Sequence, residues 1–245
     1  MVYLRLAERF DPENYAYAHR GLWTDEGPPE NSLSAFLAAA EHGLGIEFDV
    51  RPARDGVPVV FHDPVLDRMT DQTGLVEART SAELSSISLN GGGTIPTLDD
   101  LLHAWPATTP LLCELKVDGA TDPVQFAQSV ADRVSQHSGP AAMMSFCVDT
   151  VAATPDDLQR GQLILPSAVS GATDLAATPT TKVDYLACHT SDAEDPSLQA
   201  SRADLPLLVW TVKNEANCVA LAEITDSQIF EGFDPALAKR HILNR

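Results

Sequence analysis

The chain has 245 residues, of which 44% are hydrophobic and 21% are charged, a composition typical of a globular protein that can bury a sizeable core. Its 35 acidic and 16 basic residues give a formal net charge of −19, which argues against nucleic acid and anionic membranes as partners. No apolar run approaches the roughly 20 residues that a membrane-spanning helix needs, so we expect no membrane insertion.

The expected compartment is the cytoplasm. The first ten residues contain no apolar run long enough for a signal peptide. The cysteines are widely spaced and match neither a metal-binding pattern nor a disulfide-rich scaffold: Cys113, Cys147, Cys188 and Cys218. We therefore expect buried free thiols, three of them in strands and one in a helix. The sequence does not predict an oligomeric state.

A buried strand is expected near the start of the chain, at residues 15–19, and it ends in His19 and Arg20. A rigid loop rich in proline follows, and either Asn31 or Ser32 can cap the amino end of the next helix. Apolar side chains then recur at helical spacing, which predicts a helix with one buried side.

The next stretch predicts a β-hairpin with acidic side chains. Residues alternate in the first strand, so that Glu47 and Asp49 share one face. The Asp-Gly pair at positions 55 and 56 is typical of a two-residue type I′ turn, and this turn places His62 opposite Asp49, in a register that could slip by a couple of residues. Clustered carboxylates repel unless a cation or a shared proton relieves them. The hairpin therefore indicates either an ordinary sheet with a solvated polar face or a metal or acid–base site.

Residues 63–96 are expected to form an insertion after this hairpin. Thr80 with Glu83, and Thr97 with Asp100, match the capping-box pattern that opens helices. Three consecutive glycines between the two boxes indicate a flexible loop.

From there the chain alternates between strand-like runs and amphipathic helical stretches. Strands are expected at residues 111–116, 142–146, 162–165, 183–189, 207–212 and 228–230. The clearest helices cover residues 123–137 and 215–224, and residues 172–181 give the weakest helical pattern. With the two earlier strands this makes eight β/α units. The pattern predicts an α/β protein, a (β/α)8 TIM barrel in a single domain over residues 1–245, with the small insertion at residues 63–96.

In such a barrel the functional side chains gather at the carboxyl ends of the strands. The polar or aromatic side chains expected there are His19, Arg20, Glu47, Asp49, Glu114, Lys116 and Trp210. Barrel strands face either the helices or the barrel interior, so the two carboxylates of the second strand cannot lie on a solvated outer face. Inward-facing carboxylates need a partner, because burying an unpaired charge is costly.

Seven motifs, in order and with family-like spacing, resemble the glycerophosphodiester phosphodiesterase family from about residue 16 to residue 233. They are His19-Arg20-Gly21, Pro29-Glu30-Asn31-Ser32, Glu47-x-Asp49-Val50, Asp55-Gly56-x-Pro58-Val59-Val60-x-His62-Asp63, Ile95-Pro96-Thr97-Leu98, Glu114-Leu115-Lys116 and Val209-Trp210-Thr211-Val212. The resemblance implies a TIM barrel that hydrolyses glycerophosphodiesters, as small-molecule substrates, to glycerol 3-phosphate and an alcohol.

The resemblance also implies a role for each matching position. Glu47, Asp49 and Glu114 would hold a divalent cation, Mg²⁺ or Ca²⁺, and an all-oxygen ligand set independently favours such hard cations over zinc. His19 and His62 would form the acid–base pair. Arg20 and Lys116 would neutralise the phosphate, and Trp210 would pack against the glycerol moiety.

The chain departs from the family pattern near the last two strands. Lys213 stands where Asn usually follows the Val-Trp-Thr-Val motif, and Glu231 belongs to a segment that replaces a usual Thr-Asp. These departures leave open the substrate contacts of the loops after the last two strands. Glu231 lies where it could reach the pocket, and either a functional role or a structural pairing fits its position. Asp63 either orients His62 or caps the turn, and His189 is expected to be a bystander near the pocket.

Two other functions fit the same barrel. A phosphodiesterase of the lysophospholipase D type, acting on lysolipids, would need an apolar groove. The insertion is the place for such a groove, with these side chains: Val65, Leu66, Met69, Leu75, Val76, Leu84 and Ile87. A non-catalytic binding protein is disfavoured, because every metal and histidine position of the family pattern is present.

Overall fold

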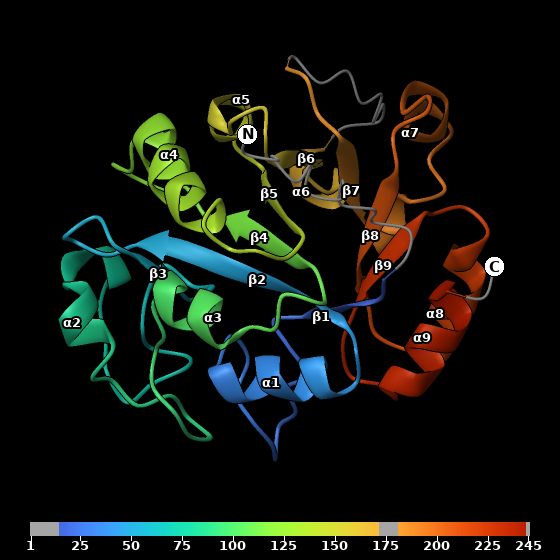
Figure 1. Cartoon of the computed structure of the whole chain (residues 1–245). Helices are drawn as coiled ribbons and strands as arrows, with labels where there is room; N and C mark the ends of the chain where they lie inside the picture. Colours follow the sequence, from blue (N-terminus) through green and yellow to red (C-terminus); the bar gives the residue numbers. More distant parts are fainter. Residues whose placement is uncertain (1–14, 172–180, 244–245) are drawn as a thin grey trace, which may run out of the picture.

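Eight parallel strands form a closed barrel in the computed structural model, which describes residues 15–171 and 181–243 (Figure 1). They are β1 (Tyr17–His19), β2 (Gly45–Pro52), β4 (Leu111–Leu115), β5 (Ala141–Ser145), β6 (Gln159–Leu163), β7 (Tyr185–His189), β8 (Leu207–Val212) and β9 (Ser227–Phe230). Consecutive strands pair in parallel, and β1 pairs with both β9 and β2, which closes the sheet. The predicted (β/α)8 TIM barrel is therefore confirmed.

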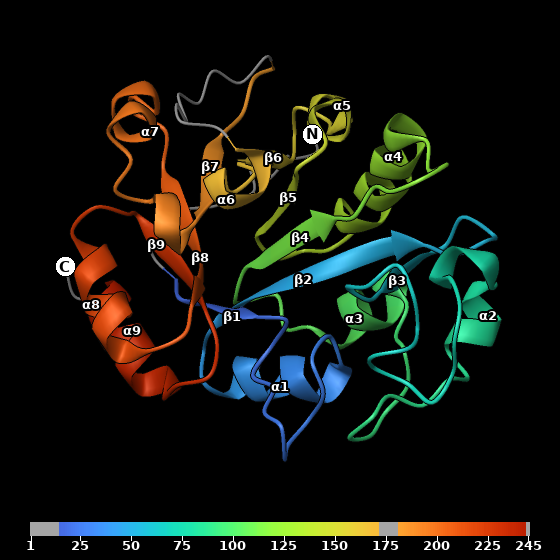
Figure 2. The same cartoon turned by 180° about the vertical axis from the view of Figure 1, so that it is seen from behind.

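Helices surround the strands on the outside (Figures 1 and 2). They are α1 (Leu33–Glu41), α2 (Ser81–Leu84), α3 (Leu98–Ala104), α4 (Pro123–Val134), α5 (Val148–Ala153), α6 (Ser167–Ser170), α7 (Pro196–Ser201), α8 (Glu215–Ala222) and α9 (Pro235–Leu243), with 3₁₀ turns η2 (Val76–Ala78) and η3 (Thr190–Asp192). Both capping boxes are present, and Ser32 rather than Asn31 caps α1. None of the helices in the described part of the chain has the length and apolar character needed to cross a membrane.

The core has two layers because successive strand residues point to opposite faces. Ile46, Phe48 and Val50 of β2 lie outward, in the layer beneath the helices. The barrel interior holds a second apolar cluster: Tyr17, Leu112, Ala142, Met144, Leu163, Tyr185, Ala187, Leu208 and Ile229. The Tyr185 ring fits there because its neighbour on β6 is Gly161, where a Cβ atom would lie 2.3 Å from the ring.

The predicted hairpin forms, but the predicted turn and register were wrong by one residue. Strand β3 (Pro58–Val60) pairs with β2 so that Val50 lies opposite Val60. The loop has three residues, because Gly56 adopts a positive φ of 77° whereas Asp55 does not. The Asp55 carboxylate instead accepts hydrogen bonds from the backbone N–H and the hydroxyl of Ser81, at the start of α2. His62 therefore does not lie opposite Asp49.

The insertion packs into a small core of its own beside β3, at one side of the barrel (Figures 1 and 2). Most of the apolar side chains proposed for a lipid groove are buried in that core: Leu66, Val76, Leu84 and Ile87. These four side chains are therefore not free to line a groove, whereas Val65 and Met69 are only partly buried. Leu75, which is 56% exposed, lies outside the buried core.

Two further predictions differ from the structure, and a third lies almost entirely outside the described residues. Strand β6 begins at Gln159, three residues before the predicted run. The apolar pattern missed its first three residues because they are polar or lack a side chain. Cys147 lies at the amino end of α5 rather than in a strand, and it is only partly buried, whereas Cys113, Cys188 and Cys218 are buried as expected. The weak helix predicted over residues 172–181 falls almost entirely outside the described residues, as do the first ten residues.

Candidate active site

A pocket of about 430 Å³ opens at the carboxyl ends of the barrel strands. All of the predicted site residues line it except Asp49, which is buried at 1% exposure and forms ion pairs with the pocket residues Arg20 and Lys116. The barrel thus brings together side chains that are spread over nearly 200 positions of the sequence, from His19 to Trp210. This position agrees with the expectation for a TIM barrel.

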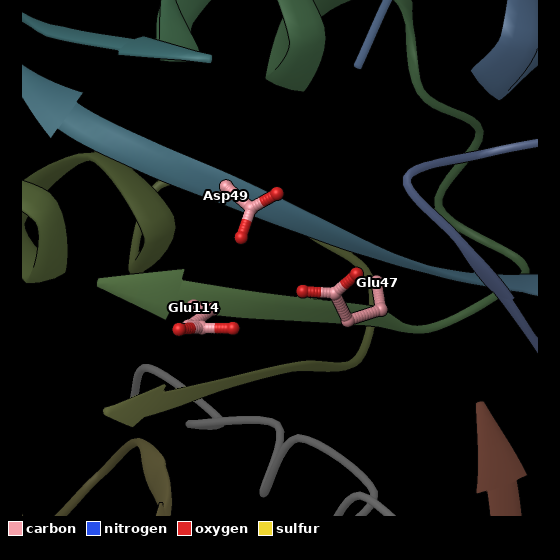
Figure 3. A group of neighbouring side chains, drawn as sticks. All are labelled: Glu47, Asp49 and Glu114. Carbon is pink, nitrogen blue, oxygen red and sulfur yellow. The ribbon is translucent and has the colours of Figure 1, made fainter. Parts of the chain in front are cut away.

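Three buried carboxylates from two neighbouring strands lie close together at this site (Figure 3). Glu47 and Asp49 project from the same face of β2, and Asp49 lies opposite Glu114 in the neighbouring β4. Each can offer one oxygen so that the three oxygens lie within 4.8 Å of one another. The Oε1 atom of Glu47 is buried and has no hydrogen-bond partner among the described residues. An all-carboxylate cluster with an unpartnered oxygen fits a hard divalent cation.

Burial and mutual repulsion act differently on these carboxyls. Burial, together with the nearby charges of Asp49 and Glu114, raises the pKa of Glu47 well above its usual range. Burial also raises the pKa of Glu114. For Asp49 the ammonium of Lys116 and the guanidinium of Arg20 outweigh burial and hold the pKa well below its usual range. Asp49 is therefore the carboxylate that stays ionised most readily.

Two cations flank the cluster. The Nε atom of Arg20 lies 3.2 Å from Oδ2 of Asp49, and Nζ of Lys116 lies 3.1 Å from Oδ1 of Asp49 and 2.5 Å from Oε1 of Glu114. Arg20 has a left-handed backbone with a φ of 57°, which its N–H to Glu47 and its carbonyl to Asn31 hold in place. Both cations face the pocket, where they can neutralise an anionic ligand.

Asn31 of the proline-rich loop supports the same cluster. Its side-chain NH₂ donates to Oδ2 of Asp49 at 2.9 Å. Glu30 lies two residues before Ser32, the cap of α1. It accepts a hydrogen bond from Arg20 at 2.9 Å and further hydrogen bonds from Arg68 of the insertion. The loop between β1 and α1 therefore orients both Asp49 and Arg20.

In each histidine of the predicted pair, the Nδ1 atom lies within hydrogen-bond distance of a carboxylate oxygen. The Nδ1 atom of His62 lies 2.7 Å from Oδ1 of Asp63, so Asp63 orients His62. The Nδ1 atom of His19 lies 2.5 Å from Oε2 of Glu231, and its Nε2 atom lies 3.9 Å from Glu47. Burial lowers the pKa of both imidazoles, against the opposing effect of nearby carboxylates.

Their carboxylate partners remain ionised. Against the effect of burial, hydrogen bonds with Arg68 and His62 lower the pKa of Asp63 to about 2. In the same way the hydrogen bond with His19 lowers the pKa of Glu231 to about 2. A neutral imidazole beside an ionised carboxylate donates through Nδ1, which leaves the Nε2 lone pair for the pocket.

The pocket has an aromatic side as well. The Trp210 ring lies 5.8 Å from the Phe146 ring and 5.2 Å from the His189 ring, both in edge contacts. The Nε1 atoms of Trp210 and Trp23 are buried and have no hydrogen-bond partner among the described residues. His189 contacts Trp210 and is not among the residues that line the pocket. It is a bystander near the pocket, as expected from the sequence.

Sequence reasoning missed several contributors to the site. Glu30 and Arg68 were not assigned roles, although Glu30 lies in the quoted Pro-Glu-Asn-Ser motif. Glu231 was left open, because the sequence shows only that it follows the last strand. Glu231 and His19 are 212 positions apart in the sequence, so no local pattern indicates their contact. The two residues meet because the barrel closes by pairing β1 with β9.

A model described as the "Glycerophosphoryl diester phosphodiesterase family" matches residues 19–230. A Mycobacterium tuberculosis protein named "Probable glycerophosphodiester phosphodiesterase 2" is 37% identical over 124 residues, which cover 50% of this chain and 45% of that protein. "Glycerophosphodiester phosphodiesterase 1" of Homo sapiens is 48% identical over 60 residues, 24% of this chain and 18% of that protein. The chain spans about half the length of the first two curated relatives it matches.

Solved structures share the fold over most of their length. A phosphodiesterase from Oleispira antarctica, in complex with the product sn-glycerol-3-phosphate, has a TM-score of 0.74 and 25% identity and covers 93% of this chain and 96% of that chain. A glycerophosphodiester phosphodiesterase from Thermotoga maritima has a TM-score of 0.72 and 22% identity, with 88% of this chain and 93% of that chain covered. Because the family model extends from the end of β1 to the end of β9, this chain belongs to the glycerophosphoryl diester phosphodiesterase family.

Proposed function

We propose that this chain is a metal-dependent phosphodiesterase that hydrolyses glycerophosphodiesters to glycerol 3-phosphate and an alcohol. The observation that carries the proposal is a buried three-carboxylate cluster, two members of which line one pocket together with two histidines. The Nδ1 atom of each histidine lies within hydrogen-bond distance of a further carboxylate. The family assignment supports the same reaction class. The Oleispira antarctica relative in complex with sn-glycerol-3-phosphate supports the product.

In this proposal Glu47, Asp49 and Glu114 hold a divalent cation, Mg²⁺ or Ca²⁺. When bound, such an ion supplies positive charge for the phosphate oxygens. Arg20 and Lys116 bind the phosphate beside it, and their charge lets a chain with a net charge of −19 accept an anionic substrate. Trp210, on the apolar side of the pocket, packs against the glycerol moiety.

His19 and His62 serve as the acid–base pair. Because Nδ1 of each imidazole is bound to a carboxylate, Nε2 is the atom that each can direct at the substrate. One histidine accepts the proton of the attacking hydroxyl, and the other donates a proton to the leaving oxygen. We propose the glycerol 2-hydroxyl of the substrate as the first nucleophile, which gives a cyclic phosphate that water then opens.

The proposal extends to the domain organisation, the compartment and the partners of the protein. We propose a single domain in which the insertion at residues 63–96 determines the head-group preference. The wide spacing of the cysteines and the acidic composition favour a cytoplasmic enzyme of lipid metabolism that binds neither nucleic acid nor membranes.

An activity panel tests this proposal. Purified protein is incubated with the glycerophosphodiesters of choline, ethanolamine, glycerol and inositol, and with lysolipids, after treatment with EDTA and again after addition of Mg²⁺ or Ca²⁺. We expect release of glycerol 3-phosphate only with added metal, and none in the Glu47→Gln variant. Turnover confined to lysolipids would favour the lysophospholipase D alternative. Absence of turnover on every substrate, with retained binding, would support the non-catalytic alternative.

A further inference from the structure

We propose that Glu231 is the positioning residue for His19, and that Lys213 holds Glu231 in place. The proposal rests on the catalytic role of His19 in the proposed function and adds two residues to that site. Glu231 follows β9 directly and Lys213 follows β8 directly, so both lie at the rim where the strands end.

The contacts form a chain of three side chains. Oε2 of Glu231 lies 2.5 Å from Nδ1 of His19, and Oε1 of the same carboxylate lies 2.8 Å from Nζ of Lys213. The two carboxylate oxygens of Glu231 therefore contact different partners. One contacts the imidazole of His19, and the other contacts the ammonium of Lys213. A carboxylate held from both sides has little freedom to rotate away from the imidazole.

The three side chains differ in how much of each is exposed to solvent, and the two at the site are the more buried ones. The side chain of Glu231 is 11% exposed and that of His19 is 15% exposed, whereas that of Lys213 is 67% exposed. Removing Glu231 would leave Nδ1 of His19 without an acceptor in a confined place, which is costly. Removing Lys213 would expose one oxygen of Glu231 to water, which can replace the ammonium at small cost.

The consequence for His19 is the choice of tautomer. With an ionised carboxylate at Nδ1, the ring proton belongs to Nδ1 and the lone pair to Nε2, which points toward Glu47 at 3.9 Å. Without Glu231 the ring could rotate about its side chain or carry its proton on Nε2. Either change would remove the lone pair from the place where the substrate is bound.

The other histidine has the same arrangement, built from different elements. His62 contacts Asp63, and Asp63 contacts Arg68. In both cases an imidazole Nδ1 binds a carboxylate, and the carboxylate binds a cation. The parallel supports a positioning role for Glu231, because a purely structural ion pair would not need to repeat the geometry at the second histidine.

Nuclear magnetic resonance gives a test that does not depend on activity. Ring ¹⁵N spectra of histidine-labelled protein, with Mg²⁺ or Ca²⁺ present at about pH 8, distinguish the two neutral tautomers, and the His19→Gln variant assigns the signal. We expect the Nδ1–H form in the parent protein and a shift toward Nε2–H or a mixture in Glu231→Ala. The Nε2–H form in the parent protein would overturn the proposal, even if glycerophosphodiester hydrolysis were absent altogether.

Kinetics provide the second readout. Glu231→Ala should lower kcat by about 10- to 100-fold, the size of loss known for carboxylates that orient metal-bound histidines, with little change in KM. Glu231→Gln keeps an acceptor oxygen and should lose less than Glu231→Ala, and Lys213→Met should lose least. Glu223→Ala, an exposed position at the end of α8, is the matched control and should behave as the parent protein.

The outcomes separate positioning from a structural role. Equal losses in Glu231→Gln and Glu231→Ala, accompanied by equal losses of thermal stability, would show that Glu231 only stabilises the barrel rim. An unchanged kcat and an unchanged tautomer in Glu231→Ala would refute the proposal. If no variant is active but the tautomer shifts as expected, the proposed reaction fails while the contact is upheld.

Discussion

The Nζ atom of Lys116 lies 3.1 Å from Oδ1 of Asp49, so the most strongly ionised carboxylate of the cluster already has a protein cation beside it. A divalent cation in the same cluster would share this carboxylate with Lys116. No lysine of residues 15–171 and 181–243 forms an ion pair with Glu47, and the Oε1 atom of Glu47 has no hydrogen-bond partner there. Glu47 is therefore the carboxylate whose removal should affect a metal most selectively.

The first prediction is that Glu47→Gln weakens divalent-metal binding at least about tenfold while the barrel stays folded. A loss of that size already follows removal of residues that only support metal ligands, and Glu47 would be a ligand itself. Isothermal titration with Mg²⁺ and Ca²⁺ measures the affinity, and Glu41→Gln, exposed at the end of α1, is the matched control. Unchanged metal affinity in Glu47→Gln would exclude this cluster as the metal site.

The second prediction separates the metal from the phosphate. Lys116→Met should lower turnover, because the phosphate loses a positive charge, but it should not weaken metal binding, because the removed ammonium repels a cation at the same carboxylates. Turnover and titration calorimetry on the same preparation check both halves. Weaker metal binding in this variant would mean that Lys116 mainly orients Asp49 and Glu114.

The third prediction concerns pH and stability at Asp63. Its pKa falls from 3.8 to about 2 on folding, so its contribution to stability is present above the unfolded value and is lost as the pH falls through the folded value. The difference in unfolding free energy between the parent protein and Asp63→Asn should therefore be largest above about pH 4 and shrink toward pH 2. Urea unfolding over this range measures it, and a difference independent of pH would contradict the prediction.

Much of the barrel could be predicted because its strands alternate with amphipathic helices, and period-two alternation alone places Glu47 and Asp49 on one face. Fine register could not be predicted. In the hairpin turn Asp55 accepts hydrogen bonds from Ser81, a contact across 26 positions that no local pattern reveals. The partner of His19 was out of reach for the same reason, since Glu231 meets it only when the last strand pairs with the first.

The fourth prediction assigns head-group preference to the insertion. Arg68 binds Glu30 and Asp63, so the insertion also supports the site through Arg20 and His62. Exchanging residues 71–92 for those of a relative, with Asp63 and Arg68 retained, should change the preference among glycerophosphodiesters and leave metal binding intact. A folded chimera with the parent preference would place the determinants in the later loops of the barrel.

The last prediction concerns the chemical steps. His19 and His62 come from β1 and from the segment after β3, and both line the pocket beside the carboxylate cluster. If one accepts a proton from the glycerol 2-hydroxyl while the other protonates the leaving oxygen, then either His→Ala change should slow turnover at least about 100-fold. A substrate analogue that lacks the 2-hydroxyl should not be cleaved, although it should still bind and compete with the substrate. Glycerol 3-phosphate release, measured with both substrates, checks each part. Rapid hydrolysis of the 2-deoxy analogue would exclude internal attack and leave water as the nucleophile, and near-normal turnover of one histidine variant would remove that residue from the pair.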